Sequence, residues 1–171
     1  MTTNQDGTTE IYVLRHATPA ASDLPNHSRP LSEVGQHQAK VLVSYLSSLN
    51  LKAVYTSPFR RAVDSITPFC KAANLTPVAR EDLGESGENE QLPEVRSRLI
   101  QALSFITEVN SGKRTLVCTH GGCLWGAISY FDESFGYEDY RKIRTPDMRK
   151  IVFGAGPPRL DSEFAFDLPQ A

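Results

Sequence analysis

The sequence predicts an α/β fold, a three-layer sandwich in which helices flank a mostly parallel central sheet. Short runs of apolar and β-branched residues alternate along the chain with longer segments in which apolar residues recur every three or four positions. This alternation of strands and helices is typical of parallel sheets that are covered on both faces. Because ligands bind at the carboxyl ends of strands in such sheets, the residues after each predicted strand are candidates for function.

The chain has the size and composition of one ordinary globular domain. It contains 171 residues, of which 40% are hydrophobic, and this is enough to build a core and to exclude wholesale disorder. We expect a disordered tail over residues 1–9, where the sequence is polar, and a single domain over residues 10–171. The sequence does not predict an oligomeric state.

Charge and cysteine content exclude several classes of function. The net charge is −2, so the chain has no large basic field and we expect no nucleic-acid partner. It has no apolar run long enough to span a membrane, and its polar beginning lacks the pattern of a secretory signal. Three cysteines are an odd number and too few for a disulfide framework. We therefore expect a cytoplasmic protein with reduced thiols.

The first third of the chain predicts two strands with a loop and a helix between them. Residues 11–14 are apolar and β-rich, as in a buried strand, and residues 18–30 are rich in proline and polar residues, as in a loop. Ser32 is suited to cap a helix that follows it, and Asn50 is a plausible end for that helix. Residues 53–56 then predict a second short strand.

The middle of the chain predicts a helix, a strand and an acidic loop. Apolar spacing predicts a helix over residues 59–73, but Pro68 lies inside it, so we expect a kink or an early end near Thr67. A third strand is predicted at 77–80. Residues 83–91 are acidic and contain two glycines, as in an exposed loop.

The last part of the chain continues the alternation. A long helix is predicted to begin at Leu92, where Pro93 follows, and a buried apolar strand at 115–119. Residues 121–130 predict another helix. Two further strands are predicted in the remainder, 150–153 and 163–166.

Chemically active residues follow four of the predicted strands. In chain order they are Arg15 and His16, then Ser57, Arg60 and Arg61, then Glu85, and finally His120 and Gly121. Parallel strands bring their carboxyl ends to one edge, so two histidines, several arginines and a carboxylate are expected to converge there.

This set of residue types suits phosphoryl transfer through histidine. A neutral imidazole is a good nucleophile near pH 7 and forms a phosphohistidine by attacking phosphorus. Arginines bind the phosphoryl oxygens with rigid forks. A second histidine, protonated by the local negative charge, stabilises the same oxygens, and a carboxylic acid protonates the leaving oxygen before activating water. Gly121 begins a helix beside His120, and the free N–H groups of that terminus favour an anion.

Four segments, in this order, resemble signatures of one known family. They are Leu14-Arg15-His16, then Arg29-Pro30-Leu31-Ser32-Glu33-Val34-Gly35-Gln36-His37-Gln38-Ala39, then Ser57-Pro58-Phe59-Arg60-Arg61-Ala62, and Thr119-His120-Gly121-Gly122. The family is the histidine phosphatase superfamily, also called phosphoglycerate mutase-like. The resemblance covers residues 11 to about 130, and the short chain is similar to its small compact members.

The resemblance implies a role for each matching residue. His16 is expected to be the nucleophile, and Arg15 and Arg61 to bind the phosphoryl group, while Arg60 matches a variable position. The remaining implied roles are stabilisation by His120, proton donation by Glu85 with Glu88 as the alternative acid, and a place near the phosphate for Ser57.

The sequence departs from the family pattern at three places. Ala17 follows His16 where the family has glycine, and this substitution fails if the position needs a positive φ. The Thr-x-x-Asn that often comes next is replaced by residues 18–22, which contain no asparagine. Few residues separate Glu85 from the next helix, so we expect a minimal cap over the site.

We predict a cofactor-independent phosphatase that acts on small phosphomonoesters. The alternatives are a protein phosphohistidine phosphatase, a phosphoglycerate mutase and a non-catalytic phosphate-binding module. A carboxylic acid helps most with a poor alkoxide leaving group, so Glu85 favours phosphomonoesters. Cys118 and Cys123 flank His120, but their spacing matches no zinc pattern, so we predict no metal site. The expected partner is a phosphorylated small molecule or a phosphohistidine protein.

Overall fold

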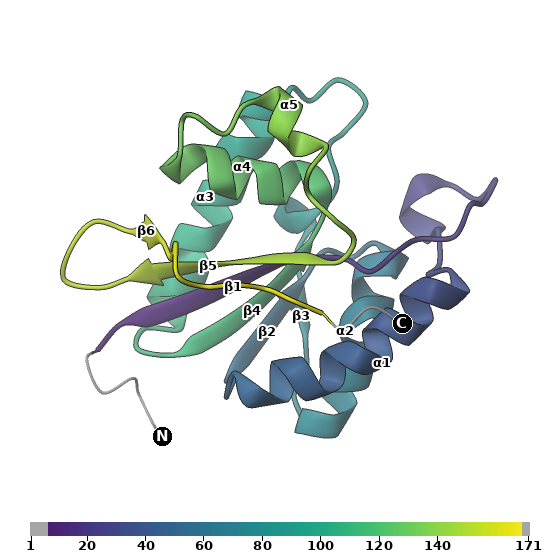
Figure 1. Cartoon of the computed structure of the whole chain (residues 1–171), viewed down its shortest axis with the longest axis horizontal. Coiled ribbons are helices and arrows are strands. Elements are labelled where there is room, and N and C mark those ends of the chain that lie inside the picture. The colour runs from purple at the N-terminus through teal and green to yellow at the C-terminus, as the bar shows by residue number, and fades with distance from the viewer. Residues whose placement is uncertain (1–6, 169–171) are drawn as a thin grey trace.

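A six-stranded sheet forms the centre of the molecule (Figure 1) in this computed structural model, which describes residues 7–168. Its strand order is β3-β2-β4-β1-β5-β6. Strands β3, β2, β4 and β1 are parallel, and β5 and β6 run antiparallel to their neighbours. The strands are β1 (Thr9–Arg15), β2 (Ala53–Thr56), β3 (Val78–Ala79), β4 (Arg114–Thr119), β5 (Asp147–Phe153) and β6 (Arg159–Leu160).

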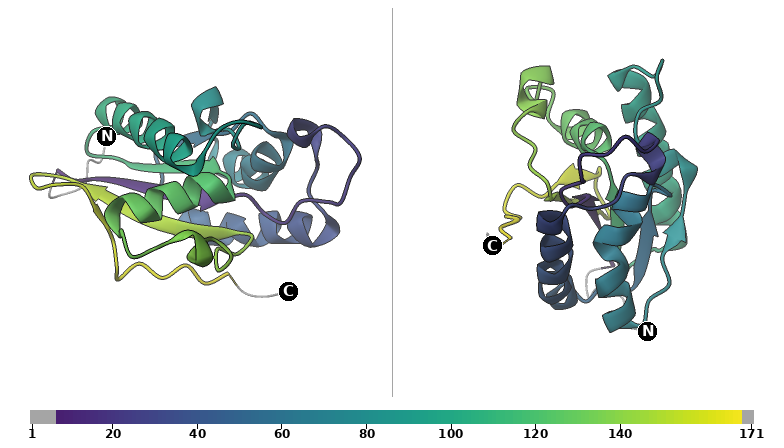
Figure 2. Two further views of the ribbon diagram at one scale, coloured as in Figure 1. Left: turned by 90° about the horizontal axis from the view of Figure 1, so that it is seen from above. Right: turned by 90° about the vertical axis from the view of Figure 1, so that its right-hand side faces the viewer.

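Helices cover both faces of the sheet, which confirms the predicted three-layer α/β sandwich (Figure 2). One face carries α1 and α2, and the other carries α3 and α4. Their bounds are α1 (Glu33–Ser48), α2 (Arg60–Ala73), α3 (Leu92–Val109) and α4 (Gly121–Phe131). The shorter elements are α5 (Tyr137–Tyr140) and the 3-10 turns η1 (Asn26–Ser28) and η2 (Glu81–Leu83).

The apolar character of β1 follows from its burial on both faces. Ile11 and Val13 pack into the core under α3 and α4, and Leu14 packs into the core under α1 and α2. Successive side chains of a strand point to opposite faces, so a strand between two helical layers needs apolar residues at every position. Strand β4 beside it is buried in the same way.

Helix α1 begins as its sequence predicts, but α2 does not end where proline suggests. The side chain of Ser32 accepts a hydrogen bond from the Gly35 N–H, which caps α1. Helix α2 continues through Pro68 to Ala73, so the expected early end near Thr67 is wrong. Phe69 and Cys70 are buried against the sheet, and this packing keeps the last turns helical despite the missing hydrogen bond.

Three other expectations need correction or fall partly outside the described residues. The strand predicted at 163–166 does not form, and β6 pairs with β5 instead. The ring of Phe166 packs on that of Tyr45, with centroids 5.1 Å apart, so the apolar residues there serve side-chain packing. The third strand shortens to Val78–Ala79. Of the predicted tail, residues 1–6 lie outside the described part, while Thr9 is buried and begins β1.

The parallel strands end together at one edge of the sheet. Arg15 at the end of β1 lies opposite Thr119 at the end of β4, and Thr56 of β2 lies opposite Cys118. This register brings the segments that follow the three strands into one region. No helix of the described residues is long and apolar enough to cross a membrane.

A close backbone contact joins α1 to the segment after β1. A Cβ atom on Gly35 would collide with the carbonyl oxygen of Thr18 and lie 3.0 Å from its carbon. That oxygen cannot retreat easily, because it accepts hydrogen bonds from the Ser32 N–H at 3.0 Å and from the Ser32 hydroxyl at 3.1 Å.

We therefore expect Gly35→Ala to lower the free energy of unfolding by about 3 kcal/mol, the upper range for overpacking. Urea unfolding followed by circular dichroism measures it. Gly136→Ala is the matched control, because a Cβ there meets no atom within 4 Å. Equal stability of the two variants would contradict the importance of this contact.

Candidate active site

His16 follows β1 directly and is fixed by both ring nitrogens. Its side chain is buried, and its backbone N–H donates to the Thr119 carbonyl at 3.0 Å. Nδ1 lies 2.8 Å from the Ala17 carbonyl oxygen, and Arg61 Nε donates to Nε2 at 3.1 Å. A carbonyl only accepts and a guanidinium only donates. The neutral ring therefore carries its proton on Nδ1 and keeps the lone pair on Nε2.

Alanine is compatible with the position after His16. Among the described non-glycine residues, a positive φ occurs only at Asn50 and Asn74. Ala17 therefore has an ordinary backbone, and its N–H donates to Ser65 Oγ at 2.8 Å. The departure from the family's glycine costs no left-handed strain.

His120 lies beside His16 and is fully buried at the start of α4. The two rings are 5.1 Å apart between centroids. His120 Nε2 lies 2.7 Å from Ser57 Oγ, and Nδ1 lies 3.5 Å from Glu85 Oε2. Ser57 follows β2 and is buried. The structure thus brings the ends of β1, β2 and β4 together in one cluster.

The two predicted arginines are each held by a hydrogen bond to a backbone carbonyl. Arg61 is buried, and its Nη1 donates to the Asn26 carbonyl at 2.6 Å while Nη2 lies 3.4 Å from Glu85 Oε2. Arg15 Nη1 donates to the Ile143 carbonyl at 2.7 Å. A Cβ on Gly121 would lie 3.0 Å from Arg15 Cζ, so the Arg15 guanidinium lies against the N-terminus of α4.

Sequence reasoning missed Arg29 as a member of this cluster. Its positive charge acts on both His16 and Arg61. The sequence feature that could have indicated this role is the position of Arg29 as the first residue of the family-like Arg29-Pro30-Leu31 segment. Arg29 Nη2 donates to the Ala20 carbonyl at 3.2 Å.

Several buried nitrogens of the cluster make no hydrogen bond to the part of the chain that the structure describes. Arg15 Nε, Arg29 Nε and His120 Nδ1 have no hydrogen-bond partner among the described residues, although each atom is buried. Buried polar atoms are normally satisfied. Arginine Nε–H groups are donors only, so two of them without an acceptor, in a cluster of positive charges, suit an anionic ligand with several acceptor oxygens.

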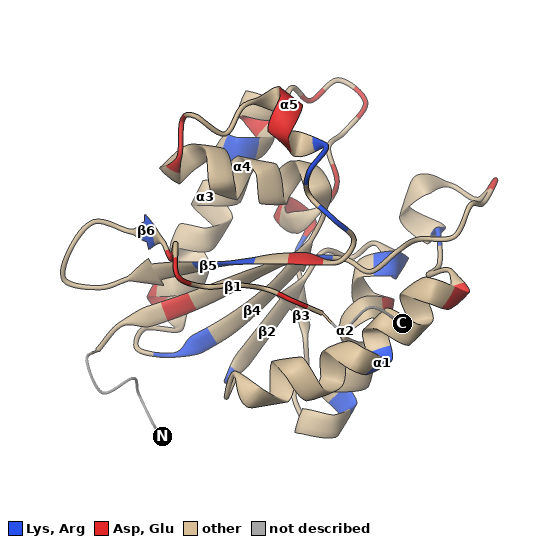
Figure 3. Ribbon diagram, in the orientation of Figure 1, with Lys and Arg blue, Asp and Glu red and all other residues tan. Residues whose placement is uncertain are grey.

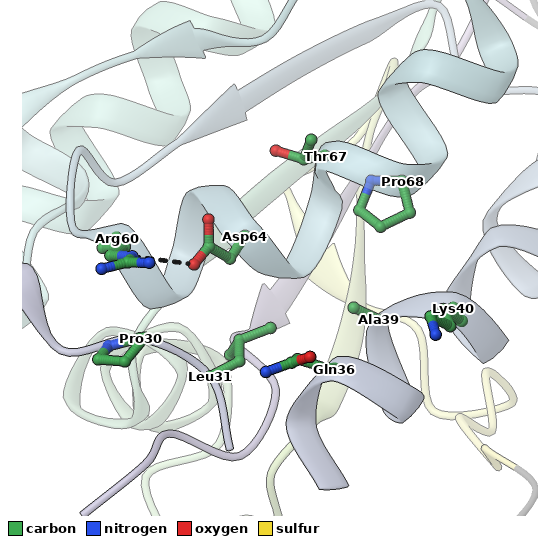
Figure 4. Close-up of a pocket in the computed structure, with 9 residues that line it drawn as sticks. All are labelled: Pro30, Leu31, Gln36, Ala39, Lys40, Arg60, Asp64, Thr67 and Pro68. Carbon is green, nitrogen blue, oxygen red and sulfur yellow. Dashed lines mark hydrogen bonds and ion pairs between the residues drawn. The ribbon is translucent and has the colours of Figure 1, made fainter. Parts of the chain in front are cut away.

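Geometry distinguishes the paired candidates that sequence left open. Glu85 points into the cluster, whereas Glu88 is exposed. Arg61 is buried at the histidines, whereas Arg60 is half exposed and pairs with Asp64 at 3.4 Å. Arg60 lines a groove of about 350 Å³ between α1 and α2, and neither His16 nor His120 is among the residues that line it. Figure 4 shows Arg60 beside Asp64 there.

Burial and positive charge keep both imidazoles neutral. Burial lowers the pKa of His16 to about 4, and the charges of Arg61, Arg15 and Arg29 act in the same direction. Burial also holds the pKa of His120 well below its usual value, with the neighbouring His16 and Arg61 contributing. The sequence-based expectation that His120 carries a proton is therefore corrected: without a bound anion, its imidazole is neutral.

The same residues bear on the question of a metal. Ligand atoms of His16, His120 and Glu85 lie within 4.8 Å of one another, a spacing that a cation could use. However, Arg61 already donates to His16 Nε2 and pairs with Glu85, and two more arginines lie close by. This surrounding positive charge opposes a second cation, so the cluster suits an anion better.

Tyr140 of α5 is a further neighbour that the sequence did not indicate. Its hydroxyl oxygen would lie 3.1 Å from a Cβ on Gly121, beside the Arg15 guanidinium. Figure 3 shows basic positions in the segment from α5 to β5 and at the start of α2, on the same side of the molecule. Arg141, Lys142 and Arg144 belong to that segment.

Comparison with known proteins agrees with this geometry. The sequence matches the histidine phosphatase superfamily (branch 1) over residues 11–90 and 85–160. Sequence comparison with curated proteins finds no match.

Solved structures share the fold at low sequence identity. YhfR of Bacillus stearothermophilus is 19% identical with a TM-score of 0.76, covering 91% of this chain and 96% of that one. A phosphoserine phosphatase mutant from Entamoeba histolytica, in complex with phosphoserine, is 16% identical with a TM-score of 0.74, covering 90% and 95%. The protein histidine phosphatase SixA complexed with tungstate is 17% identical with a TM-score of 0.69, covering 89% and 94%.

These likenesses establish the fold, and the sequence match adds the family. The matched segments run from residue 11 to residue 160 and include every residue of the histidine and arginine cluster. The chain belongs to the histidine phosphatase superfamily (branch 1).

Proposed function

We propose that this chain is a cofactor-independent phosphatase that hydrolyses small phosphomonoesters through a phosphohistidine at His16. The observation that carries the proposal is the hydrogen bond from Arg61 Nε to His16 Nε2. It supports a neutral ring whose lone pair faces the arginines, as a nucleophile for phosphorus requires. The three arginines are suited to the three oxygens of the transferred group.

In the first step, Arg61 Nε transfers its hydrogen bond from His16 Nε2 to a phosphoryl oxygen. His16 Nε2 then forms a bond to phosphorus while the bond from phosphorus to the leaving oxygen breaks. The protonated carboxyl of Glu85 gives its proton to that oxygen, so the product leaves as an alcohol. Arg15, Arg29 and Arg61 balance the charge of the phosphoryl oxygens. The negative charge of the substrate raises the pKa of His120, and the imidazolium then stabilises the same oxygens.

In the second step, water attacks phosphorus and the bond to His16 Nε2 breaks. Glu85, now a carboxylate, takes a proton from the water. The enzyme returns to its initial state, and inorganic phosphate leaves. The loop between Glu85 and α3 is short, which leaves the phosphohistidine accessible to water and favours hydrolysis over the mutase reaction.

The position of Glu85 supports catalysis over simple phosphate binding. A binding module needs no acid, and an acidic loop without a catalytic role is expected to face solvent. The Glu85 carboxylate instead lies 3.5 Å from His120 Nδ1 and 3.4 Å from Arg61 Nη2. An acid at this place has most value for a poor alkoxide leaving group, so it also favours phosphomonoesters.

A protein phosphohistidine is the second candidate substrate. The short rim of the site would admit a protein surface, and SixA, which shares the fold, is described as a protein histidine phosphatase. The Entamoeba histolytica relative is described as a phosphoserine phosphatase in complex with phosphoserine. The dependence on Glu85 distinguishes the two, because a phosphorus–nitrogen bond has a leaving group that needs less help from an acid.

We expect His16→Ala to lose at least 1,000-fold in kcat/KM for p-nitrophenyl phosphate, because no other residue replaces the nucleophile. Hydrolysis in excess EDTA and rapid-quench trapping of radiolabelled phosphoenzyme measure this. His37→Ala removes an exposed histidine of α1 and serves as the control. Retention of more than a few per cent of turnover by His16→Ala would refute the covalent mechanism.

We expect Glu85→Gln to reduce kcat for phosphoserine by about 100-fold and to spare p-nitrophenyl phosphate, whose leaving group needs little protonation. Steady-state rates with both substrates test this. Glu88→Gln is the matched control, because Glu88 is an exposed acid of the same loop. Equal losses on both substrates would remove the role of proton donor.

The low pKa of His16 predicts a loss of stability in acid. The unfolded ring binds a proton below about pH 6.5, but the folded ring does so only near pH 4. The free energy of unfolding therefore falls as the pH drops between these values. We expect wild type to lose about 2 kcal/mol more than His16→Asn between pH 7 and pH 4.5, by urea unfolding. Identical pH dependence in the two proteins would show that the folded His16 titrates normally.

A further inference from the structure

The backbone just before Glu85 is held by side chains from three different elements. The Asp82 carbonyl accepts from Arg98 Nη1 at 2.7 Å, and the Leu83 carbonyl accepts from Thr119 Oγ1 at 2.6 Å. The Gly84 carbonyl accepts from Arg98 Nη1 at 3.2 Å and from Cys123 Sγ at 3.3 Å. Three consecutive carbonyls are thus bound immediately before the carboxylate that enters the site.

Arg98 also holds the far end of the same loop. Its Nε and Nη2 donate to the two carboxylate oxygens of Glu90, each at 2.7 Å. Arg98 lies on α3, and its side chain is 24% exposed. This paired geometry is the strong, directional form of an arginine–carboxylate contact. One guanidinium therefore ties residues 82, 84 and 90 to a helix of the core.

The contacts of Arg98 with the loop carbonyls and with Glu90 lie outside the phosphoryl site itself. Among the described residues, Arg98 makes no hydrogen bond or ion pair with His16, His120 or Glu85, and its donors are directed to the loop. Only its charge reaches the histidines, where it adds to those that lower the pKa of His120. The hydrogen bond from Arg98 also lowers the pKa of Glu90, so the pair stays charged in mild acid. Arg98 thereby holds the loop on both sides of Glu85, through the carbonyls of residues 82 and 84 before it and the carboxylate of Glu90 after it.

We propose that Arg98 is a positioning residue that holds the Glu85 loop against α3 and so sets the place of the catalytic carboxyl; this inference rests on the function proposed above. Glu85 reaches its place near His120 from a loop without regular structure. Proton transfer requires hydrogen-bond reach of the leaving oxygen, and a displacement of about 1 Å is costly in such a site.

The first test compares leaving groups. Arg98→Met keeps much of the side-chain volume and removes every loop contact of the guanidinium. We expect kcat for phosphoserine to fall about 10-fold and kcat for p-nitrophenyl phosphate to change less than twofold, the same selectivity as Glu85→Gln. Glu90→Gln, which keeps the two carbonyl contacts, should give a smaller loss with the same selectivity. Equal losses on both substrates would overturn the proposal.

A double variant separates positioning from an independent effect. If Arg98 acts only through Glu85, Glu85→Gln combined with Arg98→Met should be no slower on phosphoserine than Glu85→Gln alone. An additional 10-fold loss in the double variant would show a separate role for Arg98. Arg96→Met is the matched control, since it removes a guanidinium from the same helix that makes none of these loop contacts.

Hydrogen exchange tests the contact without relying on turnover. We expect Arg98→Met to raise amide exchange in residues 84–91 at least 10-fold and to leave β1 and β4 unchanged. Faster loop exchange in a protein that hydrolyses no phosphoester would refute the proposed function and leave the loop contact standing. Unchanged loop exchange would refute the positioning role even in an active enzyme. Faster exchange throughout the chain would show that Arg98→Met is misfolded. In that case amide exchange of residues 84–91 in Glu90→Gln tests the positioning role instead.

Discussion

The gathering of three arginines around two buried imidazoles is the constraint on which the rest of the site depends. Such positive charges repel one another, and burying a guanidinium costs free energy unless acceptors take up some of its donors. Each arginine is accordingly tied to a loop carbonyl: Arg61 to Asn26, Arg15 to Ile143 and Arg29 to Ala20. The irregular segments around the strand ends therefore serve as acceptors that hold cations in place. The Glu85 carboxyl, 3.4 Å from Arg61 Nη2, adds a further acceptor for that guanidinium.

The sequence predicted the residues that lie directly after parallel strands. His16, Ser57 and His120 follow β1, β2 and β4, and the strand register alone brings their backbones together. Arg29 and Tyr140 were not predicted as site residues, because they come from segments outside this regular geometry. Their places depend on how a loop and a short helix pack, and neither hydrophobic spacing nor turn chemistry determines that packing. Arg61 could be preferred to Arg60 only by the family pattern, since adjacent helix residues differ in direction by about 100°.

The errors in the fold have the same origin, because tertiary burial overrode a local signal. Pro68 removes one hydrogen bond from α2, but the buried Phe69 and Cys70 hold the following turn on the sheet. A strand was predicted over residues 163–166, yet the ring of Phe166 packs on Tyr45 of α1. In both places the hydrophobic residues in the sequence indicate that side chains are buried. They do not indicate whether the segment is buried as a hydrogen-bonded β-strand or only through side-chain packing.

At some positions of the family segments the structure has no room for a Cβ atom, and at others a residue larger than glycine fits. Gly35 has no room for a Cβ because the Thr18 carbonyl, two residues after His16, lies against it. Gly121 lies less tightly at the start of α4, where a Cβ would be 3.0 Å from the end of the Arg15 side chain. Ala17 replaces a family glycine with ordinary backbone angles and a satisfied N–H. Close approach of the backbone, and not backbone freedom, thus explains the glycine at position 35, whereas the alanine at position 17 causes no left-handed strain.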